Sequence, residues 1–165
     1  MTRSIAESFL KEFDPEMAST RKLLERVPAE RLDWKPHGKS RSLGELATHV
    51  AELPRWGVRF RGDSWQVGSE KPPALRNAAE FVARFDENVA AARAGLLATD
   101  DPAMAQDFTV RKPDGEIFFK LSRRAIFRRV LLSHIIHHRG QLTVYLRMQD
   151  VPLPPVYGPT ADESV

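Results

Sequence analysis

The sequence contains no cysteine, and this absence limits its chemistry. Disulfide bonds are excluded, which fits a reducing compartment. The chain also cannot supply a thiolate, the reactive form of the cysteine side chain. Any sulfur chemistry must therefore use a sulfur atom that a ligand brings.

Long apolar runs are missing as well. No segment approaches the roughly 20 apolar residues that a membrane helix needs. The first stretch, MTRSIAESFLKEFDPE, carries charges from the start and has no apolar run of the kind found in a signal peptide. We therefore expect no membrane association and, by elimination, a cytoplasmic location. Internal repeats and low-complexity tracts are also not found.

Net charge is low: 25 basic and 22 acidic residues give a formal value of +3. A chain so nearly balanced predicts a nucleic-acid surface only where basic residues cluster. One such cluster comprises Arg123, Arg124, Arg128 and Arg129. It has no interleaved exposed aromatic residues, so we interpret it as a solvated face. An anionic ligand or nucleic acid is the alternative.

The 165 residues, of which 42% are hydrophobic and 28% charged, indicate one globular domain spanning residues 1–165. Apolar residues recur at spacings near 3.6 in four segments, which predicts four amphipathic helices. The first runs from Ile5 to Val27, and Pro15 is expected to kink it or to start its second part.

The second predicted helix opens at Ser42. Glu45 three residues later completes a capping-box pattern, in which each side chain accepts a hydrogen bond from the other residue's free backbone N–H. The apolar stripe extends to Phe60, and Pro54 should bend or end the helix in its second half. The third helix starts near Asn77, and its apolar face ends at Leu96.

The fourth predicted helix runs from Ser122 to about Gln149. Its expected buried stripe consists of Phe127, Leu131, His134, His138, Gln141, Tyr145 and Met148. Between the third and fourth helices, two β-prone runs at 108–111 and 117–121 flank a Lys-Pro-Asp-Gly turn, which predicts a β-hairpin. The loop at 63–76 shows no clear pattern.

The last residues, 150–165, include four prolines and cannot be helical. We expect an extended C-terminal tail anchored by Tyr157. Together the patterns predict an all-α protein: a four-helix bundle with a short β-hairpin between the third and fourth helices and an extended C-terminal tail.

Two of the five histidines, His134 and His138, are four residues apart, so they share one face of the fourth helix. Because that face is predicted to be buried, each ring nitrogen needs a partner. Two alternatives remain open: hydrogen bonds to polar groups in the core, or a shared metal ion. The spacing of four residues on a helix suits a metal.

A third histidine favours the metal. His49 borders the apolar stripe of the second helix, so it could meet His134 and His138 inside the bundle, where such proteins build metal sites. Three imidazoles without cysteine suit Zn²⁺ or Ni²⁺ best, and Cu²⁺ and Fe²⁺ are alternatives. Three protein ligands leave a coordination position open, as in catalytic sites, where a metal can ionise a bound water or thiol or act as a Lewis acid.

The other two histidines and two polar residues near the predicted ligands are not expected to bind the metal. His137 lies about 100° around the helix from His138 and is expected at the surface or at a helix interface. His37 is a loop histidine, interpreted as solvated. Glu45 and Gln141 are within helical reach of His49 and His138 and could orient them. The simpler interpretations are that Glu45 is a cap and Gln141 an ordinary interior hydrogen-bonding residue.

Three stretches, SLGELATHVAELPRW, HIIHHRGQLTVYLR and PLPPVYGPTADE, resemble the DinB/YfiT-like superfamily of metal-dependent bacterial proteins. The similarity runs over nearly the whole chain. It implies a four-helix bundle, commonly a homodimer, with a divalent metal held by three histidines. On this chain those positions are His49, His134 and His138.

The resemblance also implies a class of activity. Characterised members of the superfamily include thiol-dependent S-transferases and a thiol-dependent maleylpyruvate isomerase, so a low-molecular-weight thiol and a small electrophile are the expected partners. The leading hypothesis is a metal-dependent enzyme, a thiol S-transferase or a related transferase or hydrolase, whose catalytic residues the sequence does not identify. The alternative is a non-catalytic metal- or ligand-binding stress-response protein. A DNA-associated factor is a third hypothesis, supported only by the arginine cluster.

Overall fold

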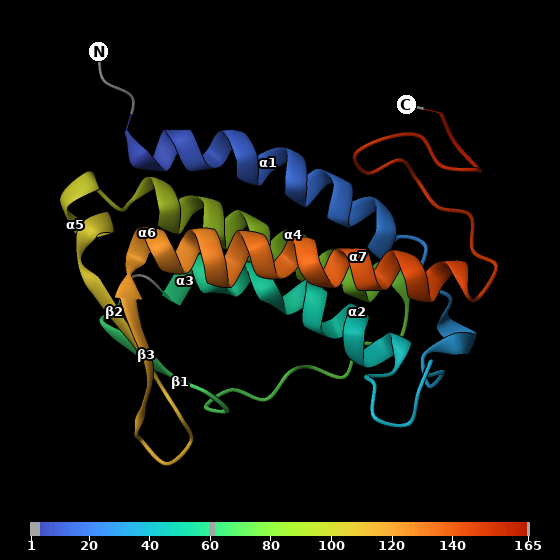
Figure 1. The fold of residues 1–165 in the computed structure, drawn as a ribbon, viewed down its shortest axis with the longest axis horizontal. Helices are drawn as coiled ribbons and strands as arrows, with labels where there is room; N and C mark the ends of the chain where they lie inside the picture. Colours follow the sequence, from blue (N-terminus) through green and yellow to red (C-terminus); the bar gives the residue numbers. More distant parts are fainter. Residues whose placement is uncertain (1–3, 60–61, 165) are drawn as a thin grey trace.

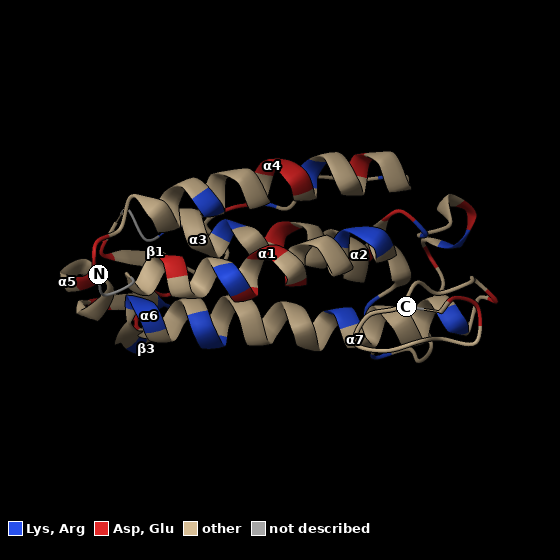
Figure 2. Ribbon diagram, turned by 90° about the horizontal axis from the view of Figure 1, so that it is seen from above, with Lys and Arg blue, Asp and Glu red and all other residues tan. Residues whose placement is uncertain are grey.

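The computed structural model describes residues 4–59 and 62–164 (Figure 1). Phe60, the predicted end of the second apolar stripe, lies outside the described residues. Long helices lie lengthwise beside one another, as the views in Figures 1 and 2 both show. They are α1 (Ile5–Leu24), α2 (Leu43–Glu52), α4 (Ala78–Leu97) and α7 (Ser133–Arg147).

The helices begin where capping residues predict. At α2 the Ser42 hydroxyl accepts a hydrogen bond from the Glu45 N–H at 3.1 Å, and the Glu45 carboxylate accepts one from the Ser42 N–H at 2.6 Å. At α4 the Asn77 side chain accepts a hydrogen bond from the Glu80 N–H at 3.0 Å. Each cap satisfies a backbone donor that has no partner inside the helix.

The two prolines act differently. α1 continues through Pro15, so the helix neither ends nor restarts there. At Pro54 the expected break is confirmed: α2 gives way to a 3-10 turn, Leu53–Arg55, followed by the short helix α3, Trp56–Arg59. A second 3-10 turn, Ala29–Arg31, follows α1, and the short helix α5, Asp101–Ala105, follows α4.

The fourth predicted helix is one rod with an irregular middle. It consists of α6 (Arg123–Ala125), a π-helical stretch (Ile126–Leu132) and α7. A π-helix bonds residue i to residue i+5, so its turn takes more residues than an α-helical turn. The backbone N–H of Ser133, for example, donates to the Arg128 carbonyl, five residues back, and the Ser133 hydroxyl donates to the same carbonyl at 3.0 Å.

This irregularity moves the buried face, so beyond Leu131 the predicted stripe is only partly buried: Tyr145 packs against the core, and Gln141 is exposed. From there the fully buried residues of α7 are Ile135, Arg139, Leu142 and Leu146. Met148 is 54% exposed, and His134 and His138 lie at the edge of the buried face, where they are partly exposed. The histidine face of α7 is therefore open to a cavity instead of sealed in the core.

The all-α prediction also needs correction, because the protein is mostly helical with a small three-stranded sheet. Strands β2 (Asp107–Arg111) and β3 (Ile117–Ser122) form the predicted antiparallel hairpin. Strand β1 (Ser64–Gln66) lies in the loop for which no pattern was found, and it pairs parallel to β2. A strand of three residues is too short to show a periodic pattern.

The tail after α7 contains neither helix nor strand in its described part, residues 150–164, as predicted. It folds back along α1 and α7 (Figure 1). Leu153 and Pro154 are buried, and the Tyr157 hydroxyl donates to the Glu16 carboxylate at 2.9 Å, which confirms the expected anchor. Among the helices of the described residues, none combines the length and apolar character needed to cross a membrane.

Candidate metal centre

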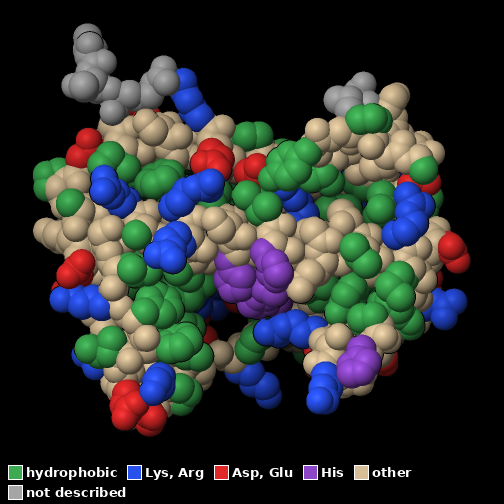
Figure 3. All heavy atoms as spheres, in the orientation of Figure 1, with side chains coloured by type: hydrophobic (Ala, Val, Ile, Leu, Met, Phe, Trp, Pro, Cys, Tyr) green, Lys and Arg blue, Asp and Glu red, His purple; other side chains and the backbone are tan. Residues whose placement is uncertain are grey.

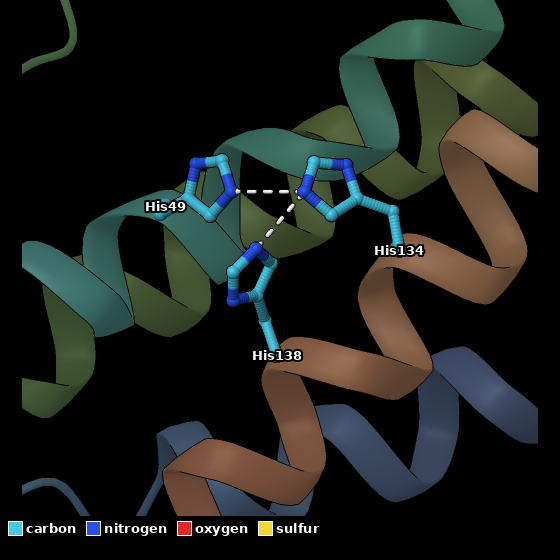
Figure 4. A group of neighbouring side chains, drawn as sticks. All are labelled: His49, His134 and His138. Carbon is cyan, nitrogen blue, oxygen red and sulfur yellow. Dashed lines mark hydrogen bonds between the residues drawn. The ribbon is translucent and has the colours of Figure 1, made fainter.

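The three predicted ligands meet. His49 comes from α2, and His134 and His138 come from successive turns of α7 (Figure 4). The Nε2 atom of His134 lies 3.4 Å from Nε2 of His49 and 2.9 Å from Nε2 of His138. One nitrogen from each ring falls within 4.8 Å of the others. The imidazoles therefore point toward a common centre.

Hydrogen bonds at the opposite ring nitrogens determine what these Nε2 atoms can do. The Nδ1 atom of His134 faces the Val130 carbonyl at 3.3 Å, and Nδ1 of His138 faces Oε1 of Gln141 at 2.7 Å. Both oxygens accept hydrogen bonds, so each Nδ1 carries the proton in the neutral ring. The Nε2 lone pairs of His134 and His138 are then directed at each other, an arrangement that a shared cation stabilises.

The separation between Nε2 of His49 and Nε2 of His134 fits a metal ion. Zinc–imidazole bonds of about 2.0–2.1 Å at tetrahedral angles place ligand nitrogens roughly 3.3 Å apart, close to the 3.4 Å between His49 and His134. Among the described residues, no carboxylate and no further histidine joins this group. The donor set is thus three imidazoles, which leaves at least one coordination position for water or a substrate.

Burial keeps the imidazoles neutral, as metal ligation requires. Desolvation is the largest cause of the lowered pKa of His49, which falls to about 3, with further contributions from His138, Arg41 and His134. Desolvation likewise lowers the pKa of His138 to about 4 and is the main cause of the lowered pKa of His134. All three rings therefore present lone pairs at neutral pH.

The histidine group is accessible from outside. Figure 3 shows it at the surface, beside a hollow. Two cavities meet at His49, Glu52 and Pro72, which line both of them. One, of about 330 Å³, lies between α2 and residues 72–76, and the other, of about 270 Å³, includes His134, Trp56 and Trp65 in its wall.

The two residues considered as orienting groups differ. Gln141 is exposed, not an interior residue as the simpler interpretation had it, and its side chain bonds His138. Glu45 caps α2 and forms an ion pair with Lys35 at 3.5 Å, so its carboxylate serves the helix terminus, as the simpler interpretation predicted. Only Gln141 of this pair supports the histidine group.

The other histidines stay outside the group. His137 is exposed, and its ring stacks edge-on against His138 with 4.8 Å between ring centroids. His37 is exposed in its loop, where its Nδ1 accepts a hydrogen bond from the Lys39 N–H at 3.1 Å. Both placements agree with the sequence interpretation.

The arginine cluster is not uniformly solvated, so that interpretation is wrong for one member. Arg123 is only 5% exposed and donates to the Gly62 carbonyl at 3.0 Å and to Asp63 at 2.9 Å, which ties α6 to the chain before β1. Arg124, Arg128 and Arg129 are exposed. Because Arg123 is buried, the exposed basic surface is smaller than the four clustered arginines predicted.

Sequence reasoning missed two arginines, one next to His138 in the sequence and one that lines a cavity with His49. Arg139 follows His138 directly and is buried against Glu16, with 2.6 Å between the charged groups. Continuing the buried face from Leu131 in steps of four would have reached it. Arg41 precedes the cap of α2 and lines the larger cavity together with His49. No local pattern distinguishes Arg41 from other loop arginines.

Comparison with known proteins identifies relatives over almost the whole chain. The chain is 26% identical over 157 residues to the uncharacterized protein YrdA of Bacillus subtilis, covering 95% of this chain and 90% of YrdA. A DinB-like protein from Bacillus cereus has a similar structure, with a TM-score of 0.72, 23% identity and coverage of 95% and 100% of the two chains.

Two further solved structures share the fold. The DinB-like protein YjoA from Bacillus subtilis superposes with a TM-score of 0.70 at 18% identity, covering 90% of this chain and 96% of YjoA. A DinB-family protein from Exiguobacterium sibiricum gives 0.66 at 21% identity, with 93% and 98% covered. The sequence model of the DinB family matches residues 1–164. The chain therefore belongs to the DinB family.

Proposed function

We propose that this protein is a metal-dependent enzyme in which His49, His134 and His138 hold a divalent ion, Zn²⁺ or Ni²⁺. The observation that carries the proposal is the convergence of three Nε2 atoms at the meeting point of two cavities. Neutral imidazoles are ligands that both ions favour. When bound, the ion would supply Lewis acidity and lower the pKa of a coordinated water or thiol.

The proposed reaction is transfer of a thiol sulfur to a small electrophile. In such a reaction a carbon–sulfur bond forms, the leaving group departs with its electron pair, and the thiol proton is released. The chain has no cysteine, so the thiol must be a cosubstrate of low molecular weight. Two cavities that share His49 offer separate places for thiol and electrophile. The DinB family resemblance supports this class of reaction.

The rival hypothesis is a non-catalytic metal- or ligand-binding stress-response protein. It would require a closed site, whereas the histidine group is partly exposed and borders both cavities. The two hypotheses predict the same bound metal and differ in turnover.

Metal analysis of protein purified without a histidine tag tests the first part of the proposal, that the three histidines bind a metal ion. We expect about one divalent ion per chain in the wild type and its loss in His134→Ala, while His137→Ala, altered on the same helix but outside the group, retains it. Absence of stoichiometric metal, or unchanged binding in His134→Ala, would refute the metal centre.

Steady-state assays with low-molecular-weight thiols and a chromogenic electrophile test the second part of the proposal, the transfer reaction. We expect thiol-dependent turnover that chelation abolishes and that re-addition of metal restores. Stoichiometric metal without turnover for any thiol would favour the non-catalytic rival.

Homodimer formation, which the family resemblance implied, is part of the proposal. Val144 on α7 and Met148, the residue directly after α7, are 57% and 54% exposed and offer apolar surface for such an interface. Light scattering on the purified protein measures its mass against the 18.7 kDa of one chain.

A further inference from the structure

The larger cavity beside the histidine group is lined by two arginines and by three carboxylates, Asp33, Glu45 and Glu52. Glu45 pairs with Lys35, and Glu52 pairs with Arg55 and Arg84. The two arginines are Arg41 and Arg76, and neither guanidinium forms an ion pair or hydrogen bond within the described residues.

The arginines of the smaller cavity differ. Arg55 and Arg59 are both paired with Glu70, at 3.1 and 2.8 Å. Among the described residues, arginines without a carboxylate partner therefore line the larger cavity, whereas the unpartnered donors of the smaller cavity are the buried Arg59 Nε and Trp65 Nε1.

Arg41 is the better placed of the two to act at the centre. Its backbone carbonyl accepts a hydrogen bond from the Tyr145 hydroxyl at 3.4 Å, and Tyr145 lies two turns beyond His138 on α7. The following residue, Ser42, is held as the cap of α2. The segment that carries Arg41 is thus attached both to the helix of His49 and to the helix of His134 and His138.

Arg41 and His49 line the same cavity, so the guanidinium borders the space that adjoins the histidine group. A divalent ion at the histidine group would add positive charge near this cation, and the two would repel each other. An anionic group between them would relieve that repulsion. The guanidinium also offers planar, paired N–H donors, which match a carboxylate.

We propose that Arg41 is a specificity-determining residue that binds a carboxylate of a small-molecule substrate in the larger cavity, so that the substrate's reacting atom lies at the histidine group. This inference rests on the proposed function and deepens it. It names the substrate class as carboxylate-bearing, whether the carboxylate belongs to the thiol or to the electrophile.

Paired ligands on the cobalt-loaded protein provide the test. Binding of 3-mercaptopropionate and of the uncharged 3-mercaptopropanol is followed by cobalt absorption and by calorimetry. We expect the wild type to bind the carboxylate about tenfold more tightly, as for one hydrogen bond to a charged group. Arg41→Gln should bring this ratio close to one and leave binding of the uncharged thiol unchanged. Arg124→Gln, an exposed arginine that lines neither cavity, is the matched control.

Succinate, which has no sulfur, distinguishes the two sources of the carboxylate. Arg41-dependent binding of mercaptopropionate assigns it to the thiol, and Arg41-dependent binding of succinate alone assigns it to the electrophile. An unchanged ratio in Arg41→Gln, together with succinate binding that does not depend on Arg41, would overturn the inference, as would equal weakening of both thiols.

A titration of metal-free protein with succinate separates this inference from the proposed function. If the protein binds no metal, the proposed function fails. Succinate binding that is lost in Arg41→Gln would still support the role of Arg41. If metal and thiol bind but no carboxylate depends on Arg41, the proposed function stands and the inference falls.

Discussion

At the scale of single residues, metal binding by the histidine group would depend on which nitrogen of each imidazole carries the proton. The Gln141 side chain and the Val130 carbonyl hold the protons on Nδ1 of His138 and His134, which leaves both Nε2 lone pairs free for an ion. Gln141 and the Val130 carbonyl would thus contribute to metal binding by orienting the ligands.

Replacing Gln141 by alanine should weaken metal binding without unfolding the protein. The variant removes the acceptor 2.7 Å from His138 Nδ1, so the ring loses its fixed tautomer and orientation. We expect affinity to fall by about 10- to 100-fold, the usual effect of removing such a partner. Competition with a chromophoric chelator measures it. His137→Ala serves as control, and equal losses in both variants would contradict the assigned role.

Acid should destabilise the metal-free protein from about pH 6.5 downward. Burial lowers the pKa of His49 to about 3 and that of His138 to about 4, whereas in the unfolded chain both titrate near 6.5. Between these values the unfolded state binds more protons, so the free energy of unfolding decreases as the pH falls.

Urea unfolding at pH 7 and pH 5 tests this pH dependence. In His49→Gln the loss of stability between the two pH values should be smaller by about 1 kcal/mol, a value that allows for partial solvent screening of the ring. Parallel losses in wild type and variant would show that the histidines do not cause the effect.

At the scale of elements, the packing of α3 on α4 requires glycine at two facing positions. A Cβ on Gly95 would lie 2.6 Å from the Gly57 carbonyl oxygen, and a Cβ on Gly57 would lie 2.6 Å from the Cβ of Ala92. The close approach packs the chain that follows α2 directly against α4. It therefore supports the wall of the smaller cavity, which Trp56 of α3 lines.

Alanine substitutions at two helical glycines should have opposite effects. Gly95→Ala introduces a clash with backbone and should destabilise the protein by about 1–3 kcal/mol. Gly140, inside α7, has nothing within 4 Å of a built Cβ, so Gly140→Ala should stabilise by about 0.5–1 kcal/mol through helix propensity. Thermal or urea unfolding measures both. A stabilising Gly95→Ala would contradict the close packing.

Local patterns predicted most elements, and the exceptions have physical causes. The caps at Ser42 and Asn77, the break at Pro54 and the hairpin could be predicted because each depends on neighbouring residues. The π-helical stretch Ile126–Leu132 could not, because its hydrogen bonds depart from the 3.6-residue period on which the prediction relied. Strand β1 could not either, since its partner β2 is distant in sequence.

At the scale of the whole molecule, a buried arginine joins the first helix, the last helix and the C-terminal tail. Arg139 of α7 contacts Glu16 of α1, and the Tyr157 ring of the tail covers its guanidinium at 4.8 Å. One nitrogen of Arg139, Nη2, has no hydrogen-bond partner in the described part of the chain. The buried charge therefore depends strongly on the Glu16 carboxylate.

Neutralising Glu16 should be costly. Glu16→Gln preserves the size of the side chain but leaves the Arg139 charge buried without a counter-ion, which should lower the free energy of unfolding by about 3 kcal/mol. Asp14→Asn is the matched control, because its ion pair with Arg93 is almost half exposed and should contribute at most about 1 kcal/mol. Similar effects in both variants, measured by urea unfolding, would contradict the importance of burial.

The amino-acid sequence by itself determined the helical segments, their caps, the hairpin, the extended tail and the identity of the three converging histidines. These features depend on spacing along the chain: four residues between His134 and His138, and an apolar stripe beside His49. Only the tertiary structure decided that the histidines face open cavities, that Arg139 is buried and that Arg41 lines a cavity with His49. Those features depend on how the π-helical stretch rotates α7 and on contacts between residues far apart in sequence, which no local pattern encodes.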